Sequence, residues 1–291
     1  MKEMLQEPGS VRIIDAADGL PLALHDLGGE GSPLLLLHGI TANARSLDAV
    51  AEDLFDQFHV FALDFRGRGR SGSPSRGAAI PEHAADAAAA IHAIGSPVHL
   101  VGHSLGALVG LYLTGEQPEL VDHLVLIDGA GDVPAANLEA IGPSLSRLEQ
   151  EYATFEDYAA TFRMAPHLQP WNSFVDAFLR LDARTLPGGA VRSRVEPGII
   201  RDELLANSTL PTLRLSQEKI RRPTLILRAA APVAEGLPPV FDRATCLQAH
   251  AVIPQSLLVE LPHLHHYSIG LQPSALRRAA LRSFLLPASQ T

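Results

Sequence analysis

Short apolar runs that alternate with helix-like segments restrict the fold of this chain more than any other feature. Eight runs have the length and composition of strands, and the first two flank a turn as in a hairpin: 11–14, 20–25, 34–37, 60–63, 98–101, 124–127, 225–227 and 257–261. Most are apolar throughout, which is typical of strands buried on both faces of a parallel sheet. Helix-like segments lie between them, at about 46–57, 81–94, 105–116, 240–250 and 273–285. The alternation predicts βαβ units, and therefore an α/β fold with a mostly parallel, eight-stranded sheet covered by helices on both faces.

The alternation stops between about residues 130 and 215. This stretch reads as helices without clear strands, at 137–152, 155–163 and 171–181, and the β/α pattern resumes at Pro223. We therefore predict an α/β core formed by residues 1–130 and 216–291, with a helical cap inserted at 131–215.

The composition of the chain excludes several classes of protein. A hydrophobic content of 46% is too high for a disordered chain, and a net charge of −9 disfavours nucleic acids and anionic membranes as partners. The one cysteine, Cys246, cannot form an internal disulfide. The chain begins without an apolar run of signal-peptide length, and no stretch approaches the roughly 18 apolar residues that span a bilayer. We expect a cytoplasmic location.

The motif Gly102-His103-Ser104-Leu105-Gly106 lies between a predicted strand and a predicted helix. A sharp turn at this junction forces its central residue into a strained conformation, and only small residues beside it let neighbouring chain pass closely. Such a turn presents the serine oxygen above the sheet at the N-terminus of a helix. An ordinary glycine-rich turn would explain the glycines alone, but the flanking elements favour Ser104 as a nucleophile.

The segment His38-Gly39-Ile40 directly follows the predicted strand 34–37. In a hydrolase with a strand–serine–helix turn, this loop supplies one N–H group of the oxyanion hole, and the residue after the serine supplies the other. We therefore predict the backbone N–H groups of Ile40 and Leu105 as oxyanion donors, and we expect His38 to hold the loop.

These motifs, together with Asp64-Phe65-Arg66-Gly67-Arg68-Gly69-Arg70-Ser71 and a late histidine, resemble the α/β-hydrolase superfamily in its cap-bearing, carboxylesterase-like branch. The resemblance covers almost the whole chain except the cap. It implies the α/β-hydrolase fold, a triad in the chain order Ser, acid, His, and no organic cofactor or metal. In this superfamily the turn that corresponds to 64–71 is mostly structural.

Three late histidines compete for the role of general base: His263, His265 and His266. Relatives often end this loop with Asn-His-Tyr-Thr, which aligns with His265-His266-Tyr267-Ser268, so we predict His266 and keep His265 and then His263 as alternatives. A metal site is the competing interpretation of the cluster. No carboxylate stands beside the three histidines and their spacing is not a typical ligand pattern, so we predict none.

The acid departs from the commonest pattern of the superfamily. The usual aspartate after the seventh strand is missing, and Pro232 stands where we would align it. A known variation moves the acid to the end of the sixth strand, which here is 124–127 and is followed by Asp128. We predict Asp128 as the acid, with Glu235 and Asp132 as alternatives; a role in capping the loop is the competing interpretation of Asp128.

The resemblance and these residues predict a serine hydrolase that cleaves a carboxylic ester of a small molecule through an acyl-enzyme on Ser104. The alternatives are hydrolysis of a lactone, amide or C–C bond of a small acidic metabolite, and a receptor-like ligand-binding protein on the same fold. We expect substrate contacts from Gly39, His103 and Trp171. Three cap arginines are candidates for pairing with a substrate carboxylate: Arg147, Arg163 and Arg180. Positions on solvated helix faces explain them equally well.

Overall fold

Eight strands form one sheet in the computed structural model, which describes residues 10–95, 97–132, 142–208 and 213–286. The order across the sheet is β1-β2-β4-β3-β5-β6-β9-β10. The β1–β2 and β2–β4 pairs are antiparallel, and every other pair is parallel. All eight predicted strands are confirmed, with these bounds: β1 Ser10–Asp15, β2 Pro21–Gly28, β3 Ser32–Leu37, β4 Phe58–Leu63, β5 Val98–His103, β6 Val121–Ile127, β9 Thr224–Ala229 and β10 Ser256–Leu261.

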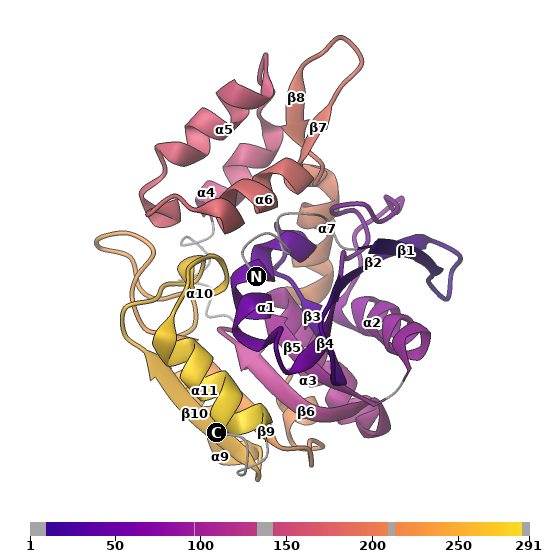
Figure 1. Ribbon diagram of the computed structural model, residues 1–291, viewed down its shortest axis with the longest axis vertical. Helices are drawn as coiled ribbons and strands as arrows, with labels where there is room; N and C mark the ends of the chain where they lie inside the picture. The colour runs from indigo at the N-terminus through magenta and orange to yellow at the C-terminus, as the bar shows by residue number, and fades with distance from the viewer. Residues whose placement is uncertain (1–9, 96, 133–141, 209–212, 287–291) are drawn as a thin grey trace.

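Helices cover both faces of this sheet, as the continuous apolar runs predict (Figure 1). Within β3, Leu34 and Leu36 pack with the helices of one face, whereas Leu35 and Leu37 pack with those of the other. The first face carries α1 (Asp48–Leu54) and α11 (Ala275–Leu285). The second carries α2 (Ile80–Ile94), α3 (Leu105–Glu116) and α9 (Arg243–Val252), and the short α8 (Arg214–Gln217) packs against α3 and α9. None of the helices described is long and apolar enough to cross a membrane.

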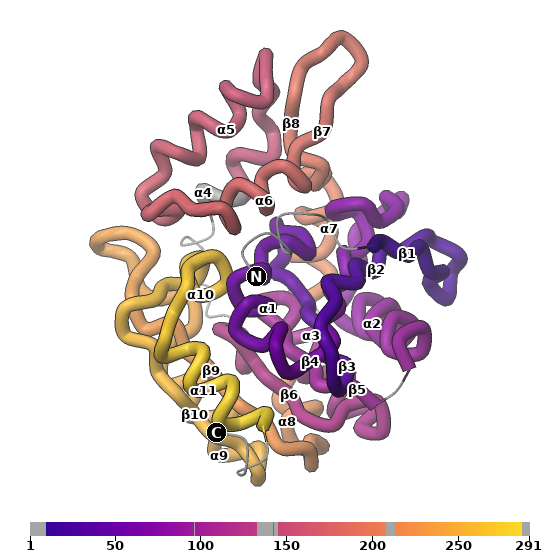
Figure 2. The backbone as a smooth tube through the Cα atoms, viewed as in Figure 1, coloured from indigo at the N-terminus to yellow at the C-terminus, as the bar shows by residue number. Residues whose placement is uncertain are grey.

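Residues 142–193, which lie between β6 and β9 in the chain, are beyond one end of the sheet, in pink to salmon at the top of the view (Figure 1). The tube in Figure 2 shows the same arrangement, with α10 (Ser268–Leu271) on the side of the core that faces this segment. The segment contains α4 (Gly142–Ser146), α5 (Phe155–Arg163), α6 (Ser173–Asp182), β7 (Ala183–Thr185) and β8 (Val191–Ser193). The next helix, α7 (Pro197–Ser208), lies beside the core (Figure 1). Below, we call residues 142–193 the cap.

The predicted helix 155–163 coincides with α5, and 171–181 appears as α6. The predicted helix 137–152 begins outside the described residues and continues as α4 and a 3-10 turn at 147–149. The expectation of a cap without strands was wrong, because β7 and β8 form a hairpin. Strands of three residues are too short to show a period, and Gly188 and Gly189 (φ 103° and 95°) form the turn. The limits of the insertion at 131 and 215 stay a prediction.

Candidate active site

Ser104 occupies a strained turn between β5 and α3. Its φ is 53° and its ψ is −118°, a conformation that residues other than glycine rarely adopt. The flanking glycines are required: a Cβ on Gly102 would lie 2.2 Å from the Gly106 oxygen, and one on Gly106 would lie 2.1 Å from the Leu37 oxygen. The Ser104 N–H donates to the Ile127 oxygen at 3.0 Å, which ties the turn to the end of β6.

Asp128 follows β6 directly and is the carboxylate that contacts His266. The His266 Nδ1 and the Asp128 Oδ2 are 2.7 Å apart, and Asp128 is 1% exposed. The other carboxylate oxygen accepts the Ala229 N–H at 3.0 Å, so Asp128 also caps the end of β9. The two alternative acids, Glu235 and Asp132, are exposed, and among the hydrogen bonds of the described residues neither reaches His266.

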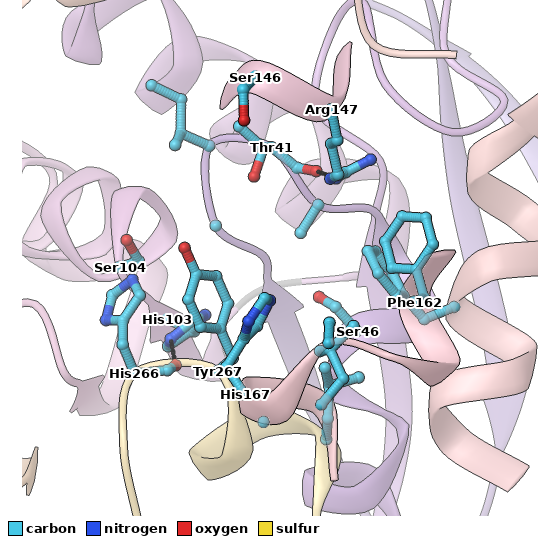
Figure 3. A pocket seen from close by; sticks show the side chains of 18 of the residues that line it. Thr41, Ser46, His103, Ser104, Ser146, Arg147, Phe162, His167, His266 and Tyr267 are labelled. Atoms are coloured by element: carbon cyan, nitrogen blue, oxygen red, sulfur yellow. Dashed lines mark hydrogen bonds between the residues drawn. The ribbon is translucent and has the colours of Figure 1, made fainter. Parts of the chain in front are cut away.

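His266 lies in the loop after β10, and its ring is buried. Because Nδ1 is engaged by Asp128, Nε2 is the nitrogen left for proton exchange with a substrate-bound oxygen. Ser104 and His266 line the same cavity, at the left of the view in Figure 3. The other two histidines differ: His263 is exposed, and the His265 Nδ1 lies 3.3 Å from the Tyr267 and Ser268 N–H groups and accepts from them.

His103 holds the backbone of His266. Its Nε2 donates to the His266 carbonyl oxygen at 2.9 Å, and the two rings are 4.8 Å apart between centroids. Burial, together with the neighbouring His266 ring, holds the pKa of His103 well below its usual range, so the ring stays neutral. His103 also lines the cavity, as expected from the sequence.

The loop after β3 lies against Ser104. A Cβ on Gly39 would be 3.4 Å from the Ser104 Cβ, and both Gly39 and Ile40 line the cavity. His38 holds the loop: its Nδ1 donates to the Gly39 oxygen at 2.7 Å and its Nε2 accepts the Phe65 N–H at 3.0 Å. Burial lowers the pKa of His38 to about 4, which keeps this neutral tautomer. Among the described residues, no hydrogen bond uses the N–H of Ile40 or Leu105.

The cavity measures about 260 Å³ and is mostly apolar. Small-molecule sites typically measure about 300–1,000 Å³, so this one fits a small substrate. Arg147 from the cap lines it, whereas Arg163 and Arg180 do not. Thr41 and Tyr267 also line the cavity. They were not predicted as site residues from the sequence, although each is adjacent in the chain to a residue that was.

The prediction that Trp171 contacts substrate is not supported by its position. Trp171 is absent from the cavity lining. Its ring packs against the cap core, and the Arg163 guanidinium lies 5.2 Å from the ring centroid. The position of this aromatic residue, between a proline and the start of α6, is explained here by packing and a cation–π contact.

Comparison with known proteins extends these observations. The chain is 32% identical over 171 residues to 2-(acetamidomethylene)succinate hydrolase of Mesorhizobium japonicum, covering 58% of this chain and 55% of that protein. It is 36% identical over 115 residues to N-formylmaleamate deformylase of Pseudomonas putida, covering 39% of this chain and 43% of that protein. The chain therefore spans about half the length of these curated relatives.

The fold has a solved counterpart. The crystal structure of E-2-(acetamidomethylene)succinate hydrolase matches with a TM-score of 0.81 over 95% of this chain and 98% of that one, at 22% identity. At this identity the likeness establishes the fold. The sequence profile of the alpha/beta hydrolase fold family matches residues 32–270, which span the sheet from β3, the cap and the loop that carries His266. The chain belongs to the α/β-hydrolase fold family.

Proposed function

We propose that this chain is a serine hydrolase that cleaves an amide bond in a small substrate bearing a carboxylate. Two relatives support this by their names, one for the hydrolysis of 2-(acetamidomethylene)succinate and the other for the deformylation of N-formylmaleamate. Both names describe a carbonyl–nitrogen bond beside a carboxylate. They favour our alternative of a small acidic metabolite over the carboxylic ester.

The proposed chemistry uses the residues around Ser104. The Ser104 oxygen attacks the acyl carbon while His266 takes its proton, and Asp128 holds the imidazole tautomer and stabilises the imidazolium. The N–H groups of Ile40 and Leu105 stabilise the oxyanion. His266 then protonates the departing amine, which leaves an acyl-enzyme. Water, deprotonated by His266, attacks the acyl carbon and releases the acid and Ser104.

The position of Arg147 is the observation that supports a substrate with a carboxylate. It is a guanidinium in the cavity of Ser104 and His266, shown at the upper right of Figure 3. Its Nη1 donates to the Asp182 Oδ2 at 2.8 Å and its Nη2 to the Thr41 oxygen at 2.6 Å. Burial opposes its charge, but Asp182 and Tyr158 more than compensate and raise the pKa of Arg147 above its usual value.

The contacts of Arg147 leave donors for a ligand. Three of the five guanidinium N–H groups are engaged, by Asp182, Tyr158 and Thr41. Within the described chain, the Nε–H and one Nη2–H have no hydrogen-bond partner. Two donors on one planar group are what bidentate binding of a carboxylate requires.

Substitution of Arg147 is expected to remove the preference for an acidic substrate. We expect wild-type protein to hydrolyse an N-acyl amide that carries a carboxylate more efficiently than the matching neutral methyl ester of that carboxylate. A hydrogen bond to a charged group contributes about 1.5–3 kcal/mol, so Arg147→Gln should lower kcat/KM for the acidic substrate about 10- to 100-fold. The loss should lie mainly in KM, and the neutral substrate should change little.

Arg163→Gln is the matched control, because Arg163 is a cap arginine that does not line the cavity. It should leave both substrates unaffected. Equal turnover of neutral short-chain p-nitrophenyl esters and acidic amides, unchanged by Arg147→Gln, would overturn the proposed substrate class and restore the carboxylic ester. The cytoplasmic location and the absence of nucleic-acid or membrane partners stay predictions.

A further inference from the structure

Four successive carbonyl oxygens of the loop after β3 are each held by a hydrogen bond. The His38 oxygen accepts the Gly106 N–H at 3.0 Å, and the Gly39 oxygen accepts from the His38 Nδ1 at 2.7 Å. The Ile40 oxygen accepts two N–H groups of Arg68, and the Thr41 oxygen accepts from Arg147. With its carbonyls fixed, the loop leaves the Ile40 N–H unpaired beside the cavity.

Arg68 contributes two of these hydrogen bonds, both to the Ile40 oxygen. Its side chain is fully buried, and its five N–H donors make five hydrogen bonds. Nε and Nη2 donate to the Ile40 oxygen at 3.0 and 2.9 Å, and Nη1 donates to the Arg66 oxygen at 2.9 Å. Nη1 also donates to the Glu203 Oε1 at 2.6 Å, and Nη2 donates to the Glu203 Oε2. No other side chain offers this set of donors in one plane.

Glu203 of α7 supplies the charge that a buried guanidinium needs. It is fully buried, and it also accepts from the Ala78 N–H at 3.4 Å and contacts the His83 Nε2 at 3.2 Å. Burial alone would raise the pKa of Glu203, but the hydrogen bonds and charge of Arg68 outweigh it and lower this pKa to about 2. The carboxylate is therefore ionised throughout the usual pH range, and it holds the Arg68 guanidinium through Nη1 and Nη2.

We propose that Arg68 is a positioning residue for the oxyanion-stabilising N–H of Ile40, and that Glu203 of α7 fixes Arg68 in that role. The proposal rests on the proposed function, because it concerns the same site. The turn at residues 64–71 then contributes to catalysis through the loop after β3. It also connects α7, which leads out of the cap, to the oxyanion hole.

Arg68→Lys tests the proposal. A lysine has three donors on one nitrogen and cannot hold both the Ile40 oxygen and the two Glu203 oxygens in the same geometry. Loss of an oxyanion donor costs about 10²–10³-fold in kcat, so a displaced donor should cost about 10- to 100-fold, with KM changed less than about twofold. Affinity for a phenylboronic acid, whose tetrahedral serine adduct places an oxygen in the oxyanion hole, should fall by the same factor as kcat/KM.

Arg66→Lys is the matched control. Arg66 is a buried arginine of the same turn and binds Asp86 through two hydrogen bonds of 2.6 Å, and among the described residues its side chain makes no hydrogen bond to the loop after β3. It should lower the unfolding midpoint as Arg68→Lys does, yet leave kcat and boronic acid affinity unchanged. Glu203→Gln keeps an acceptor but loses the charge, and should lower kcat about 3- to 10-fold by loosening Arg68.

The outcomes separate this proposal from the proposed function. If wild-type protein hydrolyses substrate but Arg68→Lys matches Arg66→Lys in kcat and boronic acid affinity, Arg68 is structural and the proposal is overturned. If Arg68→Lys does not fold, Glu203→Gln is the deciding variant. A Glu203→Gln protein with wild-type kcat and wild-type affinity for the boronic acid would also overturn the proposal. A wild-type protein with neither turnover nor boronic acid binding would instead contradict the proposed function.

Discussion

Ser104→Ala abolishes turnover in the proposed mechanism. Removing the nucleophile of a comparable triad lowers kcat by about 10⁶-fold, because no other group can form the acyl-enzyme. The substitution should preserve the fold, since the turn is held by Gly102, Gly106 and the bond from the Ser104 N–H to the Ile127 oxygen. Alanine keeps that N–H. The measurement is the rate of amide and p-nitrophenyl ester hydrolysis, with the thermal unfolding midpoint as the control for folding.

A Ser104→Ala protein with wild-type turnover would contradict the nucleophile. A different result would support the receptor-like alternative: no turnover by either protein, but ligand-dependent stabilisation of both. Small carboxylates are the ligands to use in that stabilisation experiment, because Arg147 lies in the cavity whether or not Ser104 reacts.

Asp128→Asn is expected to lower kcat about 10⁴-fold, as in a comparable triad whose aspartate is replaced. The asparagine oxygen can still accept the Ala229 N–H, so the end of β9 stays capped. Its NH₂ group would then face the His266 Nδ1 and favour the wrong imidazole tautomer. The measurement is kcat for one substrate across the series of variants, with unfolding midpoints alongside.

Glu235→Gln and Asp132→Asn are the matched controls for Asp128→Asn, because both alternative acids are exposed. Each should keep wild-type kcat. If Glu235→Gln were the damaging change and Asp128→Asn retained full activity, the acid would be misassigned and Asp128 would only cap the loop.

The core was predictable because its strands are apolar on both faces. A continuous apolar run such as 34–37 is typical of a strand buried between two layers of helices. In β3, Leu34 and Leu35 lie on opposite faces of the sheet, as expected. The cap was less predictable, because β7 and β8 have three residues each and their pairing depends on a turn rather than on a hydrophobic period.

Some residues of the site could likewise be predicted from the sequence and others could not. Ser104, Asp128 and His266 follow β5, β6 and β10 in the parallel part of the sheet, so their proximity follows from the order of the strands. Arg68 and Glu203 are 135 residues apart and come from a turn and a helix, so no local pattern joins them. In the sequence, Arg147 was one of three equivalent cap arginines. In the structure it lines the cavity and bonds to Asp182 and Thr41, whereas Arg163 and Arg180 lie outside the cavity lining.

Mapping the residue labelled by a fluorophosphonate tests the central claim most directly. The reagent phosphonylates an activated serine, so mass spectrometry of wild-type protein should find one label, on Ser104. Labelling should be absent in Ser104→Ala and much slower in Asp128→Asn, because deprotonation by His266 depends on Asp128. A label on another residue, or hydrolytic turnover without any label, would contradict the account.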